Sequence, residues 1–241
     1  LIFLATGKSF RADMDREAVR WEAEFARVRA RISNYPIIQL SNGEKDETEL
    51  EIILTQGEVQ GVKAPLKKYL VNGVARRQID FVGNLRAVLF WPEHLELVTD
   101  SPSLRRRYLD SVLVQVDREY RRSLMSYERG LRQRNRLLDL INEGKAHRHQ
   151  LLFWNQLLIS VGGYLTDKRA EYITYVNQCQ MLNAKCQIEY DKSVISESRL
   201  EQYKEEEVAA KATLVGPHPD NVVVAKIPAK QDLAPREKKE L

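Results

Sequence analysis

The sequence predicts an α+β protein: a body with a mostly antiparallel sheet, into which a long helical hairpin is inserted. Three observations favour this class. Residues 1–95 alternate apolar and polar side chains and contain two Asn-Gly pairs, as antiparallel strands and their turns do. Residues 96–187 carry apolar residues three or four positions apart, which is the spacing of amphipathic helices. Alternation returns in residues 188–241, so we expect this part of the chain to lead back to the sheet.

The first region, residues 1–95, is expected to contain the strands of the sheet. Apolar residues alternate over 19–32, and the phase shifts near Arg27, which suggests a bulge or a break. Asn42-Gly43 and Asn72-Gly73 predict hairpin turns because Asn and Gly tolerate positive φ. A short apolar run before Pro92 is typical of a buried strand. The expected strands are Arg29–Ile32 paired with Leu50–Leu54, Lys68–Val71 paired with Val74–Gln78, and Leu85–Phe90.

The second region, residues 96–187, is expected to form a helical arm. Ser101-Pro102 predicts a helix start, with Ser as the cap and Pro in the first turn. An apolar stripe runs from Leu104 to Ile141, and Asp117 is placed to cap a second helix after a short break. Gly144 marks a turn before a second stripe, from Leu151 to Leu182. Two long helices joined by a short turn form an antiparallel hairpin, and 25 helical residues span about 38 Å.

The third region, residues 188–241, is expected to return to strands. Cys186–Tyr190 alternates at its start, a polar and Glu-rich stretch over 196–212 predicts a helix, and Val222–Ala225 predicts another strand. The last 16 residues are charged and contain two prolines, as a loop or frayed tail does.

Positive charge is concentrated in the helical region. The net charge is +4, but residues 101–150 hold 12 Lys and Arg against 6 Asp and Glu, which gives +6 there and −2 elsewhere. Nearly all of this excess is Arg, whose planar guanidinium suits bidentate contacts with phosphate. A one-sided basic surface indicates nucleic-acid binding. A solvated helix face is the alternative.

Several function classes are excluded by missing motifs. No run of 18 apolar residues occurs, so we expect no membrane segment. Thr6-Gly7-Lys8-Ser9 imitates the end of a phosphate loop, but position 2, where the first Gly should stand, is Ile. His147 and His149 lack further ligands nearby, so we expect no metal residue and no catalytic residue. Two cysteines are too few for a disulfide scaffold and fit a cytoplasmic setting.

Five segments, in the right order and at matching separations, carry a family pattern. They are Ala5–Arg11 (Gly-x-Ser-Phe-Arg), Phe81–Phe90 followed by Pro92-Glu93 (a strand ending in Phe-x-Pro-Glu), Ser101–Asp110 (Ser-Pro-x-x-Arg-Arg-x-Phe-Leu-Asp), Tyr127–Asn135 (Tyr-x-x-x-Leu-x-Gln-Arg-Asn) and Thr213–His218 (Gly-Pro-His). With these segments the chain resembles the RecF family of DNA replication and repair proteins, which are ABC/SMC-type ATPases. Pro219 and Asn221 depart from the family pattern, which usually has Arg or Lys and often Asp there.

The resemblance implies a central segment of such a protein. In the family the phosphate loop lies upstream of residue 1, and the signature and Walker B motifs lie downstream of residue 241. Residues 1–95 would belong to the ATPase lobe, 96–187 would form the arm lobe, and 188–241 would return to the ATPase lobe. The resemblance implies ATP and Mg²⁺ as cofactors of the full-length family, with neither site completed by this chain. Whether the chain is itself an enzyme therefore stays open.

The resemblance also implies a role in the cytoplasm. It implies an ATP-dependent homodimer that binds DNA at single-strand/double-strand junctions or gaps, together with partner proteins of recombination mediation. DNA replication, gap repair, recombination and the SOS response are the processes expected. A different class remains as the alternative, a non-enzymatic interaction module whose helical arm docks a protein partner.

Ten residues are candidates for the site. Arg11 would follow the phosphate-loop helix and is the candidate closest to nucleotide, with an ion pair as the alternative. Arg105 and Arg106 match the family's Arg pair and would contact DNA phosphates or hold their helix by ion pairs. The remaining candidates are Arg121, Arg122, Arg132 and Arg134 for DNA binding, and Gly216, Pro217 and His218 as a structural motif that shapes the turn before a strand.

Overall fold

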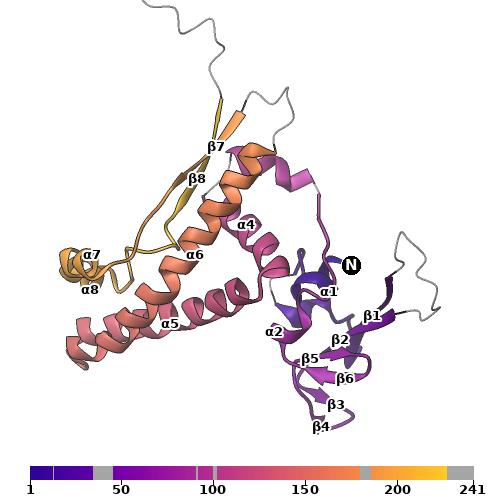
Figure 1. Cartoon of the computed structure of the whole chain (residues 1–241). Helices are drawn as coiled ribbons and strands as arrows, with labels where there is room; N and C mark the ends of the chain where they lie inside the picture. The colour runs from indigo at the N-terminus through magenta and orange to yellow at the C-terminus, as the bar shows by residue number, and fades with distance from the viewer. Residues whose placement is uncertain (13, 35–45, 91, 100–101, 180–185, 227–241) are drawn as a thin grey trace, which may run out of the picture. The chain divides into compact units, whose positions relative to one another are not determined.

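The computed structural model describes residues 1–12, 14–34, 46–90, 92–99, 102–179 and 186–226 (Figure 1). Contacts group the chain into two compact units, residues 1–90 with 111–122 and residues 91–110 with 123–241. The expected divisions after residues 95 and 187 stay a prediction. The contact-based division differs from them, because residues 111–122 group with the sheet and residues 188–226 group with the helices.

The first unit contains a short helix, a four-stranded sheet and a small two-stranded ribbon. Its elements are α1 (Ile2–Thr6), a 3-10 helix (Asp15–Ala18), β1 (Phe25–Asn34), β2 (Asp46–Thr55), β3 (Glu58–Val59), β4 (Val62–Lys63), β5 (Lys67–Val71), β6 (Val74–Arg76) and α2 (Gln78–Phe81).

The second unit is mainly helical. Its elements are a 3-10 helix (Pro92–Leu95), α3 (Glu96–Thr99), most of α4 (Pro102–Val116) and α5 (Arg118–Asn142), a 3-10 helix (Arg148–Leu151), α6 (Leu152–Gln178), β7 (Cys186–Asp191), α7 (Glu197–Gln202), α8 (Lys204–Ala210) and β8 (Asn221–Lys226).

The four-stranded sheet is antiparallel throughout, in the order β1-β2-β5-β6. Alternate residues of β2, namely Leu50, Ile52 and Leu54, are buried against α1 and α2, which form the core of this unit with them. The predicted pairing of 29–32 with 50–54 is confirmed by the register, in which Ala30 faces Leu50. The sheet therefore follows the alternation that the sequence shows.

The predicted turn at Asn72-Gly73 is confirmed. Both residues have positive φ, 50° and 75°, and Val71 faces Val74 across the turn. This is the geometry of the tight hairpin turns that Asn-Gly favours. The other predicted turn, at Asn42-Gly43, lies outside the described residues.

Two strand predictions in this unit are wrong. Residues 19–24 precede β1, which begins at Phe25, and Trp21 is 93% exposed. Residues 85–90 form no strand either, and Val88 and Phe90 are 91% and 79% exposed. Here the backbone N–H of Ala87 donates to the side-chain Oε1 of Gln115 at 2.8 Å. The Gln115 side chain therefore accepts the hydrogen bond that, in the predicted strand, would have gone to the backbone of a neighbouring strand.

The helical hairpin is confirmed. Asp117 separates α4 from α5 and accepts the N–H of Tyr120 at 2.9 Å, as a helix cap does. The helices α5 and α6 have 25 and 27 residues, and in Figure 1 they lie together at the end where they are joined and diverge from there. They approach closely at Gly130, where an added Cβ would lie 3.1 Å from the Leu157 side chain. Small residues at such crossings allow two helices to pack without a gap.

The third region contains an antiparallel pair of strands, β7 and β8, in which Ile188 faces Val224. Asn177, near the end of α6, fixes this pair by bonding both the N–H and the C=O of Ile188, at 2.9 and 2.8 Å. Leu109, Ile173 and Val222 form a buried cluster beside it. The predicted polar helix is present as the short helices α7 and α8. None of the helices in the described ranges combines the length and apolar character that a membrane crossing needs.

Candidate nucleic-acid interface

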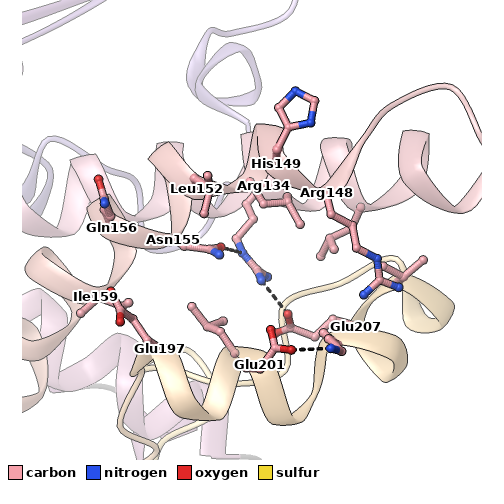
Figure 2. Close-up of a pocket in the computed structure, with 15 residues that line it drawn as sticks. Arg134, Arg148, His149, Leu152, Asn155, Gln156, Ile159, Glu197, Glu201 and Glu207 are labelled. Carbon is pink, nitrogen blue, oxygen red and sulfur yellow. Dashed lines mark hydrogen bonds and ion pairs between the residues drawn. The ribbon is translucent and has the colours of Figure 1, made fainter.

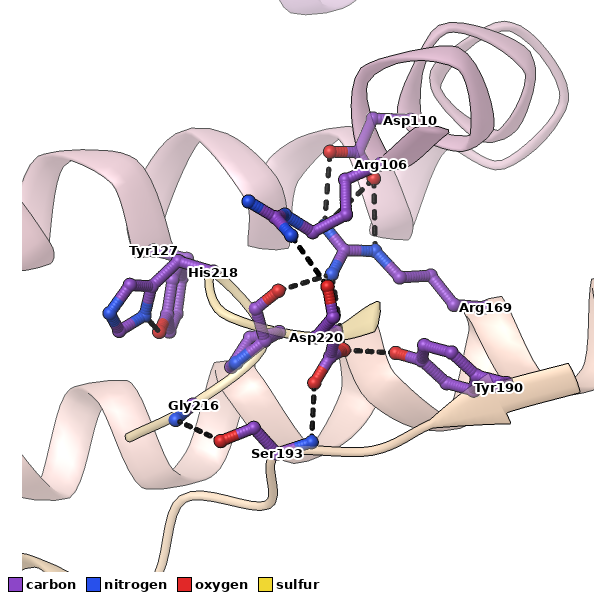
Figure 3. A network of polar contacts seen from close by, with 10 residues as sticks. Arg106, Asp110, Tyr127, Arg169, Tyr190, Ser193, Gly216, His218 and Asp220 are labelled. Carbon is purple, nitrogen blue, oxygen red and sulfur yellow. Dashed lines mark hydrogen bonds and ion pairs between the residues drawn. The ribbon is translucent and has the colours of Figure 1, made fainter. Parts of the chain in front are cut away.

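The Gly216-Pro217-His218 segment lies in a hydrogen-bonded turn of the second unit (Figure 3). His218 Nε2 lies 2.8 Å from the carbonyl oxygen of Thr213, which can only accept, so Nε2 carries the proton. In the neutral ring Nδ1 therefore accepts the Tyr127 hydroxyl, 2.8 Å away. Burial lowers the pKa of His218 and raises the pKa of Tyr127, which keeps both groups in these neutral forms.

Gly216 is required by this turn. Its φ is +127°, and an added Cβ would lie 2.4 Å from the Tyr127 hydroxyl oxygen. A side chain at this position would be strained and would also displace the hydroxyl group that His218 accepts. The N–H of Gly216 donates to Ser193 Oγ at 3.3 Å, which connects the turn to the segment after β7.

Arg169 of α6 lies at the centre of a buried polar network, with 3% of its surface exposed. Its Nε and Nη2 donate to the Asp110 carboxylate of α4 at 3.1 and 3.0 Å. Its Nη1 donates to the Pro217 carbonyl at 2.6 Å and lies 3.3 Å from Asp220 Oδ2. One guanidinium therefore joins two helices to the turn before β8 (Figure 3).

Asp220 completes this network and is fully buried. It accepts the backbone N–H of Ser193 at 2.6 Å and the hydroxyl of Tyr190. The backbone carbonyl of Asp220 accepts Nη1 of Arg106 at 2.5 Å. Two cations, Arg106 and Arg169, thus balance two carboxylates, Asp110 and Asp220, which is the condition for burying charges at low cost.

Arg134 forms a second buried centre, 2% exposed, on the inner side of α5. Its guanidinium donates to Asn155 Oδ1 at 2.8 Å, to Thr213 Oγ1 at 2.7 Å and to Glu207 Oε2 at 2.6 Å. The other oxygen of Glu207 accepts the N–H of Leu214 at 2.9 Å. Figure 2 shows Arg134 pointing from α5 toward Asn155 and Glu207.

A cavity of about 650 Å³ lies beside this pair, between α5, α6, α7 and α8 (Figure 2). Its apolar lining includes Leu138, Ile159 and Leu200. The cations at its edge are already paired: Arg148 contacts Glu205 at 2.6 Å, and Lys204 contacts Glu201. The cavity has a mixed lining of apolar, polar and charged residues, and this lining contains no nucleophile paired with a base.

Four of the predicted DNA-binding arginines have structural contacts. Besides Arg106 and Arg134, these are Arg105, whose Nη1 donates to the Leu97 carbonyl at 3.0 Å, and Arg121. Arg121 is 7% exposed, and its guanidinium donates to the carbonyls of Val114 and Ile79 at 2.7 and 2.5 Å. A phosphate would have to displace these partners, so the geometry favours a role in folding for the buried Arg121 and Arg134.

The other predicted arginines are exposed. Arg122 pairs with Glu119 at 3.1 Å, and Arg132 lies on the outer side of α5. The sequence reasoning missed Arg129 and Arg136, which are also exposed and share this side with Arg132. Their separations of three and four residues are the signal that could have identified them. We call Arg129, Arg132 and Arg136 the α5 arginine face.

Arg11 is exposed in the first unit, and its guanidinium carbon lies 5.4 Å from the centroid of the Phe10 ring. The nearby Gly7 closes the C-terminal end of α1, because its φ is 71° and its N–H donates to the Phe3 carbonyl at 2.9 Å. Phosphates bind at helix N-termini, where N–H groups are free. The residues at 6–9 therefore do not fit a triphosphate, and proximity of Arg11 to nucleotide stays a prediction.

Lys67 provides the cation at this helix end. Its Nζ donates to the Gly7 carbonyl at 2.5 Å and pairs with Asp15 at 2.6 Å. A cation at a helix C-terminus complements the negative end of the helix dipole. For metals, the described part of the chain contains no group of three or more potential ligands.

The known proteins that are similar to this chain and are named here are all called DNA replication and repair protein RecF. No family model matches the sequence. The chain is 34% identical to the DNA replication and repair protein RecF of Thermomicrobium roseum over 92% of this chain and 64% of that protein. It is 35% identical to RecF of Herpetosiphon aurantiacus over 93% of this chain and 63% of that protein. RecF of Roseiflexus castenholzii is 33% identical over a similar share.

Two solved structures of the recombination mediator protein RecF in the RecFOR pathway, RecF-ATPrS and RecF-ATP, share the fold. The TM-scores are 0.78 and 0.77 at 24% identity, over 92% and 93% of this chain and 62% and 61% of those chains. The chain spans just under two thirds of the length of the curated relatives it matches. The similarity of this chain to these RecF proteins extends over nearly all of its own residues.

Proposed function

We propose that this chain is part of a RecF-like recombination mediator that binds DNA during DNA replication, gap repair and the SOS response. The observation that carries the proposal is the similarity to RecF proteins over more than nine tenths of the chain. The basic helical region supports it, because its excess charge is arginine, the residue best suited to phosphate.

The finer parts of the proposal concern the whole protein. We expect ATP and Mg²⁺ to be bound by parts that this sequence does not include, since the phosphate-loop, signature and Walker B motifs are absent from it. We also expect an ATP-dependent homodimer, partner proteins of recombination mediation, and a cytoplasmic location.

The test is a salt titration of DNA binding by the 241-residue chain. Labelled duplex, single-stranded and gapped oligonucleotides are titrated by fluorescence anisotropy between 50 and 200 mM salt. Binding through arginine–phosphate contacts weakens with salt, with a log–log slope near −0.9 for each neutralised phosphate of duplex DNA. We expect the gapped substrate to bind at least as tightly as intact duplex. A flat salt response, or no binding to any substrate, would contradict the proposal.

A protein-docking arm is the second candidate, and one observation favours it. The cavity beside α6 is lined in part by Leu152, which is 62% exposed, and the next residue, Phe153, is 65% exposed. Exposed apolar side chains next to a recess are typical of surfaces that bind other proteins. Substituting both residues with Ser would leave DNA binding unchanged and abolish partner binding if this candidate is correct.

A further inference from the structure

The α5 arginine face, formed by Arg129, Arg132 and Arg136, is set by the geometry of the helix. At about 100° per residue, Arg132 and Arg136 lie within about 60° of Arg129 around the helix axis. At a rise of about 1.5 Å per residue, the three span about 10 Å along the axis. All three side chains are exposed. They therefore form a row along one side of the helix.

The opposite side of α5 is fully engaged in packing. Tyr127, Arg134 and Leu138 are 3%, 2% and 1% exposed, and Gly130 lies against α6. These four positions are three or four residues apart and follow the inner side of the helix. The α5 arginine face is consequently turned away from the interior of its own unit.

The charge on this face is uncompensated locally. Between residues 123 and 138 the sequence has four arginines and one acid, Glu128. Arg134 is neutralised by Glu207, whereas no ion pair joins Arg129, Arg132 or Arg136 to the residues that the structure describes.

Some exposed arginines elsewhere in the chain have ion-pair partners, whereas Arg20, Arg76 and Arg107 have none among the described residues. Those of β1 pair with glutamates of β2, and Arg122 and Arg148 pair with Glu119 and Glu205. The arginines of α5 differ from the scattered unpaired ones because three of them lie on one side of a single helix. The unpaired row is available to an external anion with several charges.

The side chains on and near the α5 arginine face indicate which kind of polyanion it suits. Guanidinium groups bind phosphate oxygens in a bidentate manner. Proteins that bind single strands stack the bases on aromatic side chains, but both tyrosines of α5, Tyr120 and Tyr127, are buried at 0% and 3% exposure. One exposed amide side chain, Gln133, lies beside the row, but contacts between the three guanidinium groups and phosphates carry no sequence information. These features favour a duplex held by its backbone.

We propose that the α5 arginine face binds the sugar–phosphate backbone of duplex DNA without reading its sequence. The inference rests on the proposed function and assigns a surface to it, adding Arg129 and Arg136 to the predicted Arg132.

The test compares two triple variants of the 241-residue chain. Arg129, Arg132 and Arg136 are replaced by Ala in one, and Arg20, Arg76 and Arg107 in the other. The second set matches the first in two ways: its three arginines are also exposed, and their replacement also removes three positive charges. Arg→Ala is nearly neutral for an exposed helix position, and circular dichroism checks that both variants fold. A third variant carries Lys at the three face positions.

Duplex binding is measured at 50 and 200 mM salt, with a single strand of equal length and polyglutamate as further probes. Each phosphate contact makes affinity fall about 3.5-fold over this range, so three contacts account for about 40-fold. We expect the face variant to lose most of that salt dependence, the control triple to keep it, and the Lys variant to retain part of it.

Five results would overturn the inference. Equal losses in both triple variants would reduce the effect to net charge, and a loss confined to the single strand would reject the duplex. Polyglutamate binding that matches DNA binding and disappears in the face variant would assign the face to an acidic protein. If the face variant binds duplex DNA as tightly as the wild-type chain does, the α5 arginine face is not the binding surface, and the proposed function stands. Absence of any DNA binding by the wild-type chain would contradict both.

Discussion

The buried Arg134–Glu207 pair gives a quantitative prediction for the second unit. Glu207→Ala removes the carboxylate from a guanidinium that is 2% exposed and also removes the acceptor of the Leu214 N–H. Leaving a buried charge without its partner costs about 3–5 kcal/mol, and an unsatisfied N–H costs about a further 1 kcal/mol or more. We therefore expect the free energy of unfolding to fall by about 4–6 kcal/mol, measured by urea denaturation with circular dichroism at 222 nm.

The matched control lies two residues earlier on the same helix. Glu205 pairs with Arg148 at the same distance, 2.6 Å, but the two side chains are 70% and 43% exposed. Water screens such a pair, so Glu205→Ala should change stability little. If Glu207→Ala is no more destabilising than Glu205→Ala, burial is not what makes the pair important.

A double variant separates charge from packing. Arg134→Met with Glu207→Leu removes both charges and fills the space with apolar atoms. Replacing a buried pair in this way is often neutral or stabilising. The double variant should therefore be more stable than Glu207→Ala alone. A double variant as unstable as the single one would mean that the hydrogen bonds of Arg134 to neighbouring elements, and not its charge balance, carry the stability.

Two further predictions concern the Gly216–His218 turn. Gly216→Ala should lower the free energy of unfolding by about 1–3 kcal/mol, because φ is +127° and the new Cβ would lie 2.4 Å from the Tyr127 hydroxyl. The control Gly163→Ala, which meets open space in α6, should raise the free energy of unfolding by about 0.5–1 kcal/mol. Equal effects of the two substitutions in urea denaturation would refute the steric argument. Burial lowers the pKa of His218 from its ordinary 6.5, so the unfolded chain binds the proton first as the pH falls. The free energy of unfolding should then decrease below pH 6.5 by at most about 1.4 kcal/mol per pH unit, and His218→Gln, compared with His149→Gln at the surface, should remove that dependence.

The sequence could predict the elements whose signals are local. The helices α5 and α6 are long, so their apolar stripes repeat over many turns. The sheet pairing of 29–32 with 50–54 follows from alternation on both strands, and the Asn72-Gly73 turn follows from the two residues themselves. Local periodicity sets these elements before tertiary contacts are considered.

The elements that the sequence could not predict depend on distant partners. Residues 85–90 are as apolar as a buried strand, but the N–H of Ala87 is bound by Gln115, 28 residues later. The partners of Arg134 lie 21, 73 and 79 residues away, and those of Arg169 lie 48 to 59 residues away. The helical spacing places Arg134 on the buried side of α5, but no local pattern identifies these distant partners. Composition therefore predicts that the helical region is basic, but it does not show that Arg134 is buried and Arg132 is exposed.

The residues that carry the family resemblance are largely those that hold the second unit together. Arg106, Arg134, Pro217 and His218 belong to the recognised segments, and each makes a contact that joins elements far apart in the sequence. A loss of the proposed DNA binding after substitution of any of them could therefore come from a disturbed fold as readily as from a missing phosphate ligand. The α5 arginine face occupies positions that the Tyr-x-x-x-Leu-x-Gln-Arg-Asn pattern leaves unspecified, or lies just beyond that pattern. Its side chains are exposed and make no ion pair with the described residues, so their substitution is the experiment that can separate DNA contact from folding.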